Sequence, residues 1–151
     1  MKILLAIDGS DAALLAVRHA LTLLEGGLKA SLVLANVQEP ASLYEVVTAH
    51  DPDVIREVRG AAGADLLAPA EALVKKAKVD FESEVAGGDP AHLLVEIAER
   101  YGCDAIVMGA RGLGGLRAAL LGSVSHAVLN ASPVPVTIVR LPTDEQAAAD
   151  D

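Results

Sequence analysis

Glycine and serine gather in one short stretch of the chain, MGARGLGGLRAALLGSVSH, at residues 108–126. Five glycines fall within fourteen positions, at Gly109, Gly112, Gly114, Gly115 and Gly122. Spaced glycines permit unusual backbone angles and allow a ligand to approach the backbone closely. A helical pattern starts at Gly122-Ser123, and the free N–H groups and dipole at a helix N-terminus favour anions. The stretch therefore predicts a phosphate-binding loop.

Two familiar phosphate-binding motifs do not fit this stretch. A P-loop needs Gly, four residues and Gly-Lys, but Gly115 stands where the lysine should be. A dinucleotide fingerprint starting at Gly112 fails at its last position, which is Arg117. The remaining pattern is Gly-x2-Gly-x9-Gly-Ser, formed by Gly109, Gly112, Gly122 and Ser123.

This remaining pattern is chemically coherent as a phosphate cradle. We expect Gly109 and Gly112 to leave the end of a strand without side chains, so that a ligand lies against the backbone. Ser123 and Ser125 would add hydroxyl donors. Arg111, or the second arginine of the stretch, would neutralise charge at the rim.

The elements that position this loop alternate along the chain. Short apolar runs predict five strands, at residues 3–7, 30–37, 79–86, 104–108 and 134–140. Helical spacing and caps predict helices after Ser10, over residues 65–78 with Pro69 in the first turn, after Asp89 and over residues 123–130. Residues 41–64 are expected to form a loop and a short helical piece.

Alternating strands and helices predict the fold class. We expect an α/β fold with a five-stranded parallel sheet in three α/β/α layers, because parallel strands need helical crossovers on the sheet faces. Ligands of such sheets bind beyond the carboxyl ends of the strands, where the strand order reverses. The phosphate loop follows one of these strand ends. We expect one domain over residues 1–141 and a frayed acidic tail over residues 142–151.

Composition narrows the class of protein. The chain has 151 residues, of which 52% are hydrophobic and 2% aromatic, so small aliphatic side chains must build the core. A net charge of −9 without a basic run argues against nucleic-acid or anionic-membrane partners. The start of the chain is unlike a signal peptide and no apolar run is long enough to cross a bilayer, which predicts a cytoplasmic protein.

Cysteine and histidine give no sign of a metal or catalytic centre. Cys103 is the only cysteine and lies beside a buried strand, so we expect a small core residue. The four histidines lack metal-ligand spacing. Ser125 and His126 are adjacent on a predicted helix and point to different faces, so they indicate no catalytic triad.

The sequence resembles the universal stress protein family of the nucleotide-binding kind. The family signature G-x2-G-x9-G-[S/T] is matched in full by Gly109, Gly112, Gly122 and Ser123. The start of the chain, ILLAIDGSD, and its end, SPVPVTIVR, are also similar to the family, so the resemblance covers nearly the whole chain and is weakest over residues 41–64. It implies an adenine-nucleotide α-hydrolase-like fold that binds ATP with Mg²⁺, and a homodimer formed through the last strand, Val134–Val139.

The resemblance also implies which residues meet the ligand. The nucleoside would contact Ala6, Asp8, Val37, Met108 and Gly109. The phosphates would contact Arg111, Gly112, Gly122, Ser123, Val124 and Ser125. Asp8 would accept from ribose hydroxyls and Val37 would offer its backbone to the adenine edge. Two structural interpretations stay open: Asp8 caps the turn beneath Ser10, and Ser123 is only a helix cap.

These observations predict a nucleotide-binding regulator of the stress response. Slow ATP hydrolysis at most is expected, because the loop has no P-loop lysine and no evident water-activating base. A ligand-dependent change in partner binding is the expected output. Two alternatives stay open: a partner-binding stress module that does not use nucleotide, and a genuine ATPase or phosphotransferase.

Overall fold

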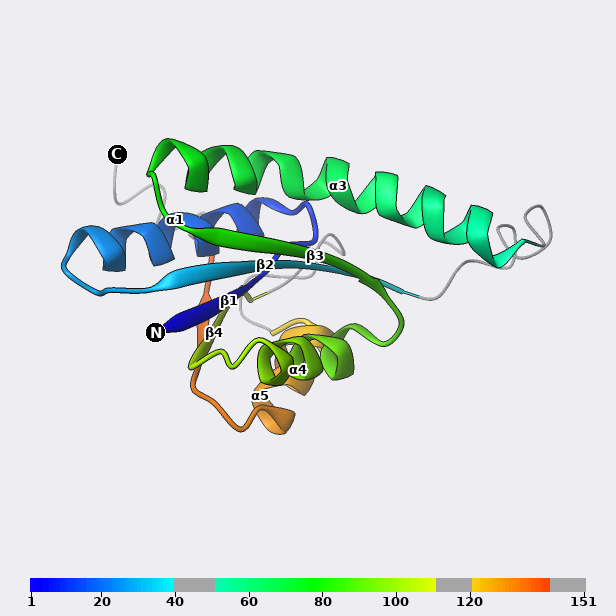
Figure 1. The fold of residues 1–151 in the computed structure, drawn as a ribbon. Coiled ribbons are helices and arrows are strands. Elements are labelled where there is room, and N and C mark those ends of the chain that lie inside the picture. The colour runs from blue at the N-terminus through cyan, green and yellow to red at the C-terminus, as the bar shows by residue number, and fades with distance from the viewer. Residues whose placement is uncertain (40–50, 111–120, 142–151) are drawn as a thin grey trace.

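The computed structural model of the chain describes residues 1–39, 51–110 and 121–141. A five-stranded sheet runs through its centre in the order β3-β2-β1-β4-β5 (Figure 1). The strands are β1 (Lys2–Ala6), β2 (Ser31–Gln38), β3 (Phe81–Gly87), β4 (Ala105–Gly109) and β5 (Val136–Val139). All four pairings are parallel, which confirms the predicted sheet.

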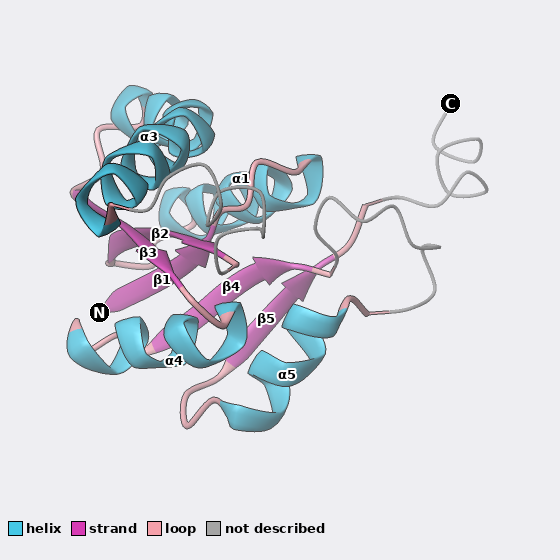
Figure 2. Ribbon diagram, turned by 90° about the vertical axis from the view of Figure 1, so that its right-hand side faces the viewer, coloured by secondary structure: helices cyan, strands magenta, loops and turns pink. Residues whose placement is uncertain are grey.

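Helices cover both faces of the sheet and complete the three predicted layers. They are α1 (Asp11–Glu25), α3 (Pro52–Lys76), α4 (Pro90–Arg100) and α5 (Ser123–Ala131). Figure 2 shows α1 and α3 on one face and α4 and α5 on the other. Each face has its own core, because successive side chains of β1 point to opposite sides: Leu5 packs with α1 and α3, and Leu4 packs with α4.

Small aliphatic side chains build these cores, as the composition predicts. Ala16, Val17 and Ala20 of α1 are fully buried against the sheet, which lets the helix approach closely. Cys103 is buried beneath α4, which confirms it as a core residue, and this burial raises the pKa of its thiol.

Helices α1 and α4 begin at N-cap residues that the sequence predicts. Ser10 Oγ accepts from Ala13 N–H at 3.2 Å and begins α1. Asp89 Oδ2 accepts from His92 N–H at 3.0 Å, and Pro90 occupies the first position of α4.

Helix α3 differs from the prediction for residues 52–76. The chain forms one helix of 25 residues, capped by Asp51 and started by Pro52, instead of a loop, a short helical piece and a helix from residue 65. Pro69 lies inside the helix and not in its first turn. A proline there removes one backbone hydrogen bond and costs about 3 kcal/mol. Burial of the face formed by Gly63, Leu67, Ala70 and Val74 offsets this cost.

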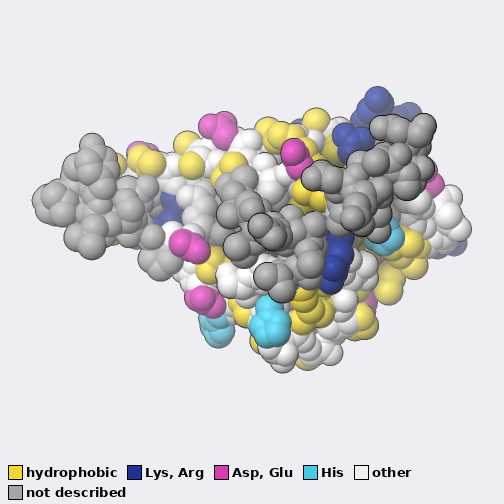
Figure 3. Space-filling model, turned by 180° about the vertical axis from the view of Figure 1, so that it is seen from behind, with side chains coloured by type: hydrophobic (Ala, Val, Ile, Leu, Met, Phe, Trp, Pro, Cys, Tyr) yellow, Lys and Arg dark blue, Asp and Glu magenta, His cyan; other side chains and the backbone are white. Residues whose placement is uncertain are grey.

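Charged side chains are interspersed on the molecular surface. On the face seen in Figure 3, the described acidic and basic side chains lie in separate places among polar and apolar ones. Among residues 1–39, 51–110 and 121–141, no helix has both the length and the apolar character needed to cross a bilayer.

Two glycines of α3 give a matched test of helix packing. A Cβ on Gly63 would lie 2.4 and 2.6 Å from the methyl carbons of Val85, whereas a Cβ on Gly60 would meet nothing within 4 Å. Gly60→Ala is expected to raise the free energy of unfolding by about 0.5–1 kcal/mol, the helix-propensity gain. Gly63→Ala makes the same gain but is expected to lower stability overall, because overpacking costs about 1–3 kcal/mol. Urea unfolding of both variants measures the difference, and equal shifts would contradict this packing.

Candidate functional site

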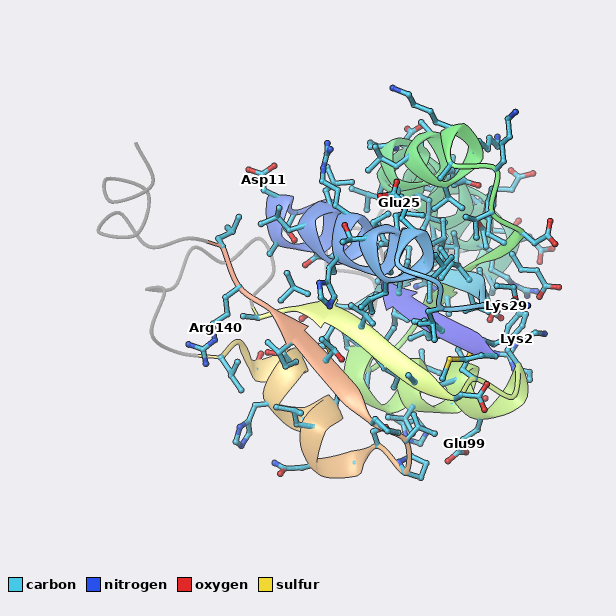
Figure 4. All side chains as sticks on the ribbon, turned by 90° about the vertical axis from the view of Figure 1, so that its left-hand side faces the viewer. Lys2, Asp11, Glu25, Lys29, Glu99 and Arg140 are labelled. Carbon is cyan, nitrogen blue, oxygen red and sulfur yellow. The ribbon has the colours of Figure 1, made fainter. Side chains whose placement is uncertain are left out.

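A cavity of about 580 Å³ opens at the carboxyl ends of β1, β2 and β4. From β1, the chain builds the sheet outward through β2 and β3 and then returns to β4 and β5 on the other side, so the strand order reverses here. The N-terminal ends of α1, α4 and α5 complete the wall. Figure 4 shows Asp11 and Arg140 at this end of the molecule, and Lys2 and Lys29 at the opposite end. The volume is within the range of ligand pockets, about 300–1,000 Å³.

The cavity brings together most of the residues singled out from the sequence. Its wall includes Ala6, Asp8, Val37, Met108, Gly109, Gly122, Ser123, Val124 and Ser125. Arg111 and Gly112 lie outside the described residues. The clustering of the described nine gives the predicted site a location, and their contacts with a ligand stay a prediction.

One backbone carbonyl joins the two ends of the glycine-rich stretch. Ala110 O accepts from Gly122 N–H at 2.7 Å and from Ser125 Oγ at 2.6 Å. Ala110 N–H in turn donates to Val139 O at 2.8 Å, which ties the residue to β5. The start of α5 is therefore fixed at the end of β4, beside the cavity.

Ser125 has a structural role that the sequence did not suggest. Its side chain is buried, and a hydroxyl has one proton to donate. Two carbonyl acceptors lie within reach of that proton, Ala110 O at 2.6 Å and Gly122 O at 3.0 Å, so donation to a phosphate would require these contacts to be given up. Ser125 thus supports the wall of the cavity, and the predicted donation to a phosphate stays untested.

Helix α5 begins without a side-chain cap. Gly122 is the N-cap residue and Ser123 is the first helical residue, so the interpretation of Ser123 as the helix cap is wrong. The first intrahelical bond shown for this helix is from His126 N–H to Gly122 O. The N–H groups of Ser123, Val124 and Ser125 precede it and have no carbonyl one turn earlier in the helix. These groups point along the helix axis and attract an anion.

Asp8 uses one carboxylate oxygen for the turn after β1. Its Oδ1 accepts from Ser10 N–H at 2.9 Å and from Ser10 Oγ at 2.5 Å. Ser10 Oγ then accepts from Ala13 N–H, so Asp8 orients the cap of α1. Oδ2 makes no hydrogen bond with any described residue, and Asp8 lines the cavity. The structural interpretation of Asp8 is therefore correct and compatible with a ligand contact through the second oxygen.

Close packing against α1 requires a glycine at position 109. A Cβ there would lie 2.7 Å from Ala12 Cβ and 2.9 Å from its carbonyl carbon. This packing is a reason for glycine that the sequence did not suggest; Gly109 also lines the cavity, and contact between a ligand and its backbone stays a prediction. Gly9 has a similar role: its φ is +88°, and a Cβ would meet Leu66 Cδ2 at 2.5 Å.

The sequence reasoning missed the polar wall at the end of β2. Asn36 is 1% exposed, and its Nδ2 donates to Ile7 O at 2.8 Å. Gln38 Nε2 donates to Asn36 Oδ1 at 3.1 Å and to Arg59 O of α3 at 2.9 Å. A buried asparagine inside the apolar run SLVLANV is a signal that would have marked this wall. Leu66 also lines the cavity. It lies inside the predicted helix over residues 65–78, but no local signal in the sequence shows that this helix reaches the carboxyl edge of the sheet.

The described cavity wall is acidic. Its ionisable side chains within the described part of the chain are Asp8 and Glu39. No group of three or more histidine, cysteine or acidic side chains among the described residues is arranged to hold a metal ion. Among the described residues of the wall, the feature that favours an anion is the N-terminus of α5.

Comparison with known proteins gives consistent matches along the chain. A model of the universal stress protein family matches residues 1–140. The universal stress protein YxiE of Bacillus subtilis is 37% identical over 146 residues, covering 92% of this chain and 98% of that protein.

Solved structures share the fold. A universal stress protein in complex with cAMP is 29% identical, with a TM-score of 0.64 and coverage of 93% of this chain and 96% of that one. The protein MJ0577 has a TM-score of 0.77 at 24% identity, with coverage of 93% and 95%. The second match concerns the fold alone.

The two serines of α5 provide a matched test of the Ala110 contact. Ser125→Ala is expected to lower the free energy of unfolding by about 1 kcal/mol, because it removes a buried hydrogen bond. Ser123→Ala is expected to change it by less than about 0.5 kcal/mol, because Ser123 is exposed at the first helical position. Urea unfolding measures both, and an equal effect would show that the Ser125 contact does not stabilise the fold.

Proposed function

The chain belongs to the universal stress protein family, and from this premise we propose that it binds ATP with Mg²⁺ at the carboxyl edge of the sheet. The observation that carries the proposal is the cavity itself. It lies at the switch point of strand order, and both the start of α5, which has no side-chain cap, and Asp8 line it. An anion and a sugar with neighbouring hydroxyls suit these two features.

The nucleoside half of the ligand is assigned to the ends of three strands. Asp8 accepts from ribose hydroxyls through Oδ2, while Oδ1 keeps its bonds to Ser10. The backbone of Val37 meets the adenine edge, and the nucleoside lies against Ala6, Met108 and Gly109. The solved relative with cAMP supports an adenine nucleotide, since cAMP shares this base and sugar.

The phosphate half is assigned to the α5 N-terminus. Ser123, Val124 and Ser125 supply backbone N–H groups, Gly122 lets the phosphates approach them because it has no side chain, and Arg111 and Gly112 are proposed to complete the cradle. The described wall carries only acidic charge, from Asp8 and Glu39. Mg²⁺ would offset the charge of the triphosphate, and it prefers phosphate and carboxylate oxygens together with water.

Signalling fits this site better than turnover. The loop lacks a P-loop lysine, and the described wall offers no lysine or histidine as a base. Hydrolysis is therefore proposed to be slow, and nucleotide binding is proposed to change the affinity for a partner in the cytoplasm. We also propose a homodimer through β5, which forms one edge of the sheet and pairs only with β4 among the described strands.

Ligand-dependent stability tests the proposal directly. ATP with Mg²⁺ at one hundred times its Kd is expected to add about 2.7 kcal/mol to the free energy of unfolding, because it binds only the folded state. Thermal unfolding with and without the nucleotide measures the effect. No shift at millimolar ATP would contradict nucleotide binding and favour a partner-binding module that does not use nucleotide.

Gly122→Val tests the phosphate position. The backbone of Gly122 has φ −68° and ψ 162°, which a residue with a side chain also adopts, so the fold is expected to remain. A branched side chain beside the α5 N–H groups is expected to abolish ATP binding, measured by titration calorimetry. Gly60→Ala, in open space on α3, is the control that keeps its affinity. Unchanged affinity in Gly122→Val would mean that the phosphates bind elsewhere.

A further inference from the structure

Two side-chain amides form a short chain of hydrogen bonds along the wall of the cavity. Asn36 and Gln38 lie two residues apart on β2, and both line the cavity. Gln38 Nε2 reaches Asn36 Oδ1 at 3.1 Å and Arg59 O at 2.9 Å, and Asn36 Nδ2 reaches Ile7 O at 2.8 Å. The chain thus connects β1, β2 and α3 at the edge where the ligand is proposed to bind.

The partners at the two ends fix the orientation of both amides. Ile7 O and Arg59 O are backbone carbonyls, which can only accept, so each must face an amide nitrogen. Asn36 therefore turns its oxygen toward Gln38, and Gln38 must donate to that oxygen through its amide nitrogen. Flipping either amide would place two acceptors against each other. The two carbonyl acceptors therefore fix the orientation of both amides.

This orientation determines what Gln38 can offer a ligand. The amide nitrogen has two protons, and both are used, one by Asn36 Oδ1 and one by Arg59 O. The oxygen Oε1 has no hydrogen bond with any described residue. Gln38 can therefore accept from a ligand but cannot donate to it without breaking its own contacts.

We propose that Gln38 makes the cavity selective for purines with a 6-amino group, through its oxygen Oε1. This inference rests on the proposed nucleotide function and goes beyond it by naming a side chain that discriminates between bases. Adenine has an N6 amino donor at the position where guanine and hypoxanthine have an oxygen acceptor. The amino group satisfies Oε1, whereas a 6-oxo group faces it as a second acceptor.

The expected selectivity follows from the cost of the mismatch. A ligand with hydrogen at the 6-position loses one hydrogen bond, worth about tenfold in affinity. A 6-oxo ligand also holds two acceptors together away from water and is expected to lose about one hundredfold.

The test uses three nucleotides and two proteins. Mg²⁺ complexes of ATP, inosine triphosphate and purine-riboside triphosphate are titrated calorimetrically into the unchanged chain and into Gln38→Met. Methionine matches the length of glutamine but has no amide. In the unchanged chain, affinity is expected to fall in the order ATP, purine-riboside triphosphate, inosine triphosphate. In Gln38→Met the difference in affinity between ATP and inosine triphosphate is expected to shrink about tenfold, because the acceptor is gone and only the proposed backbone contact of Val37 still distinguishes the bases.

This design separates base selectivity from general damage to the site. Loss of packing in Gln38→Met would weaken all three ligands by the same factor and keep their ratios, which would overturn the proposal. Glu39→Gln is the matched control: it removes a rim charge and is expected to shift all three affinities together. If Gln38→Met fails to fold, the unchanged chain still decides, since equal affinity for ATP and inosine triphosphate overturns the inference. If no nucleotide binds the unchanged chain, the proposed function itself fails.

Discussion

The contact between Ala110 O and the start of α5 is the interaction on which the site depends. The phosphate loop leaves the sheet at the end of β4 and the chain returns at Gly122, and this single carbonyl accepts from both Gly122 N–H and Ser125 Oγ. Ala110 N–H is itself bonded to Val139 O, so the contact is anchored in the sheet. The start of α5 is therefore held at the end of β4 by hydrogen bonds that lead back to the sheet. A site built in this way fixes its anion-binding groups on rigid elements, which keeps their geometry ready for a ligand.

This arrangement is compatible with the proposed anion site in an acidic protein. The chain has a net charge of −9, and the ionisable side chains of the described wall are Asp8 and Glu39. Long-range attraction therefore does not draw a phosphate to the cavity. Backbone N–H groups carry no net charge and act over short distances. They therefore favour an anion only when it is bound in direct contact with them. The Mg²⁺ of the proposed nucleotide complex would reduce the repulsion by the acidic rim.

Much of the site could be predicted because its informative residues act through short spacings and through the backbone conformation of near neighbours. The Gly-x2-Gly-x9-Gly-Ser spacing, Asp8 after β1 and the Asp89-Pro90 helix start all depend on a few neighbouring residues. Gln38 could not be found in this way, since its role depends on Arg59, which is 21 residues away and belongs to α3. Gly63 explains why the start of α3 was predicted wrongly. Glycine normally weakens a helix, but here it allows close contact with Val85. Local propensity gave the wrong boundary because the deciding contact is between distant residues.

Helix α3 is thus part of the site as well as part of the fold. Its buried residues, Gly63, Leu67, Ala70 and Val74, all belong to the portion that packs on the sheet, while Val58 in the portion before them is 58% exposed. Leu66 covers Gly9 and lines the cavity, and the carbonyl of Arg59 is held by Gln38. A ligand that contacts Leu66 and Gln38 more favourably when α3 is packed on the sheet would stabilise that packing. The exposed part of α3 continues from these contacts, so the proposed nucleotide site and the surface of this helix share one structural element.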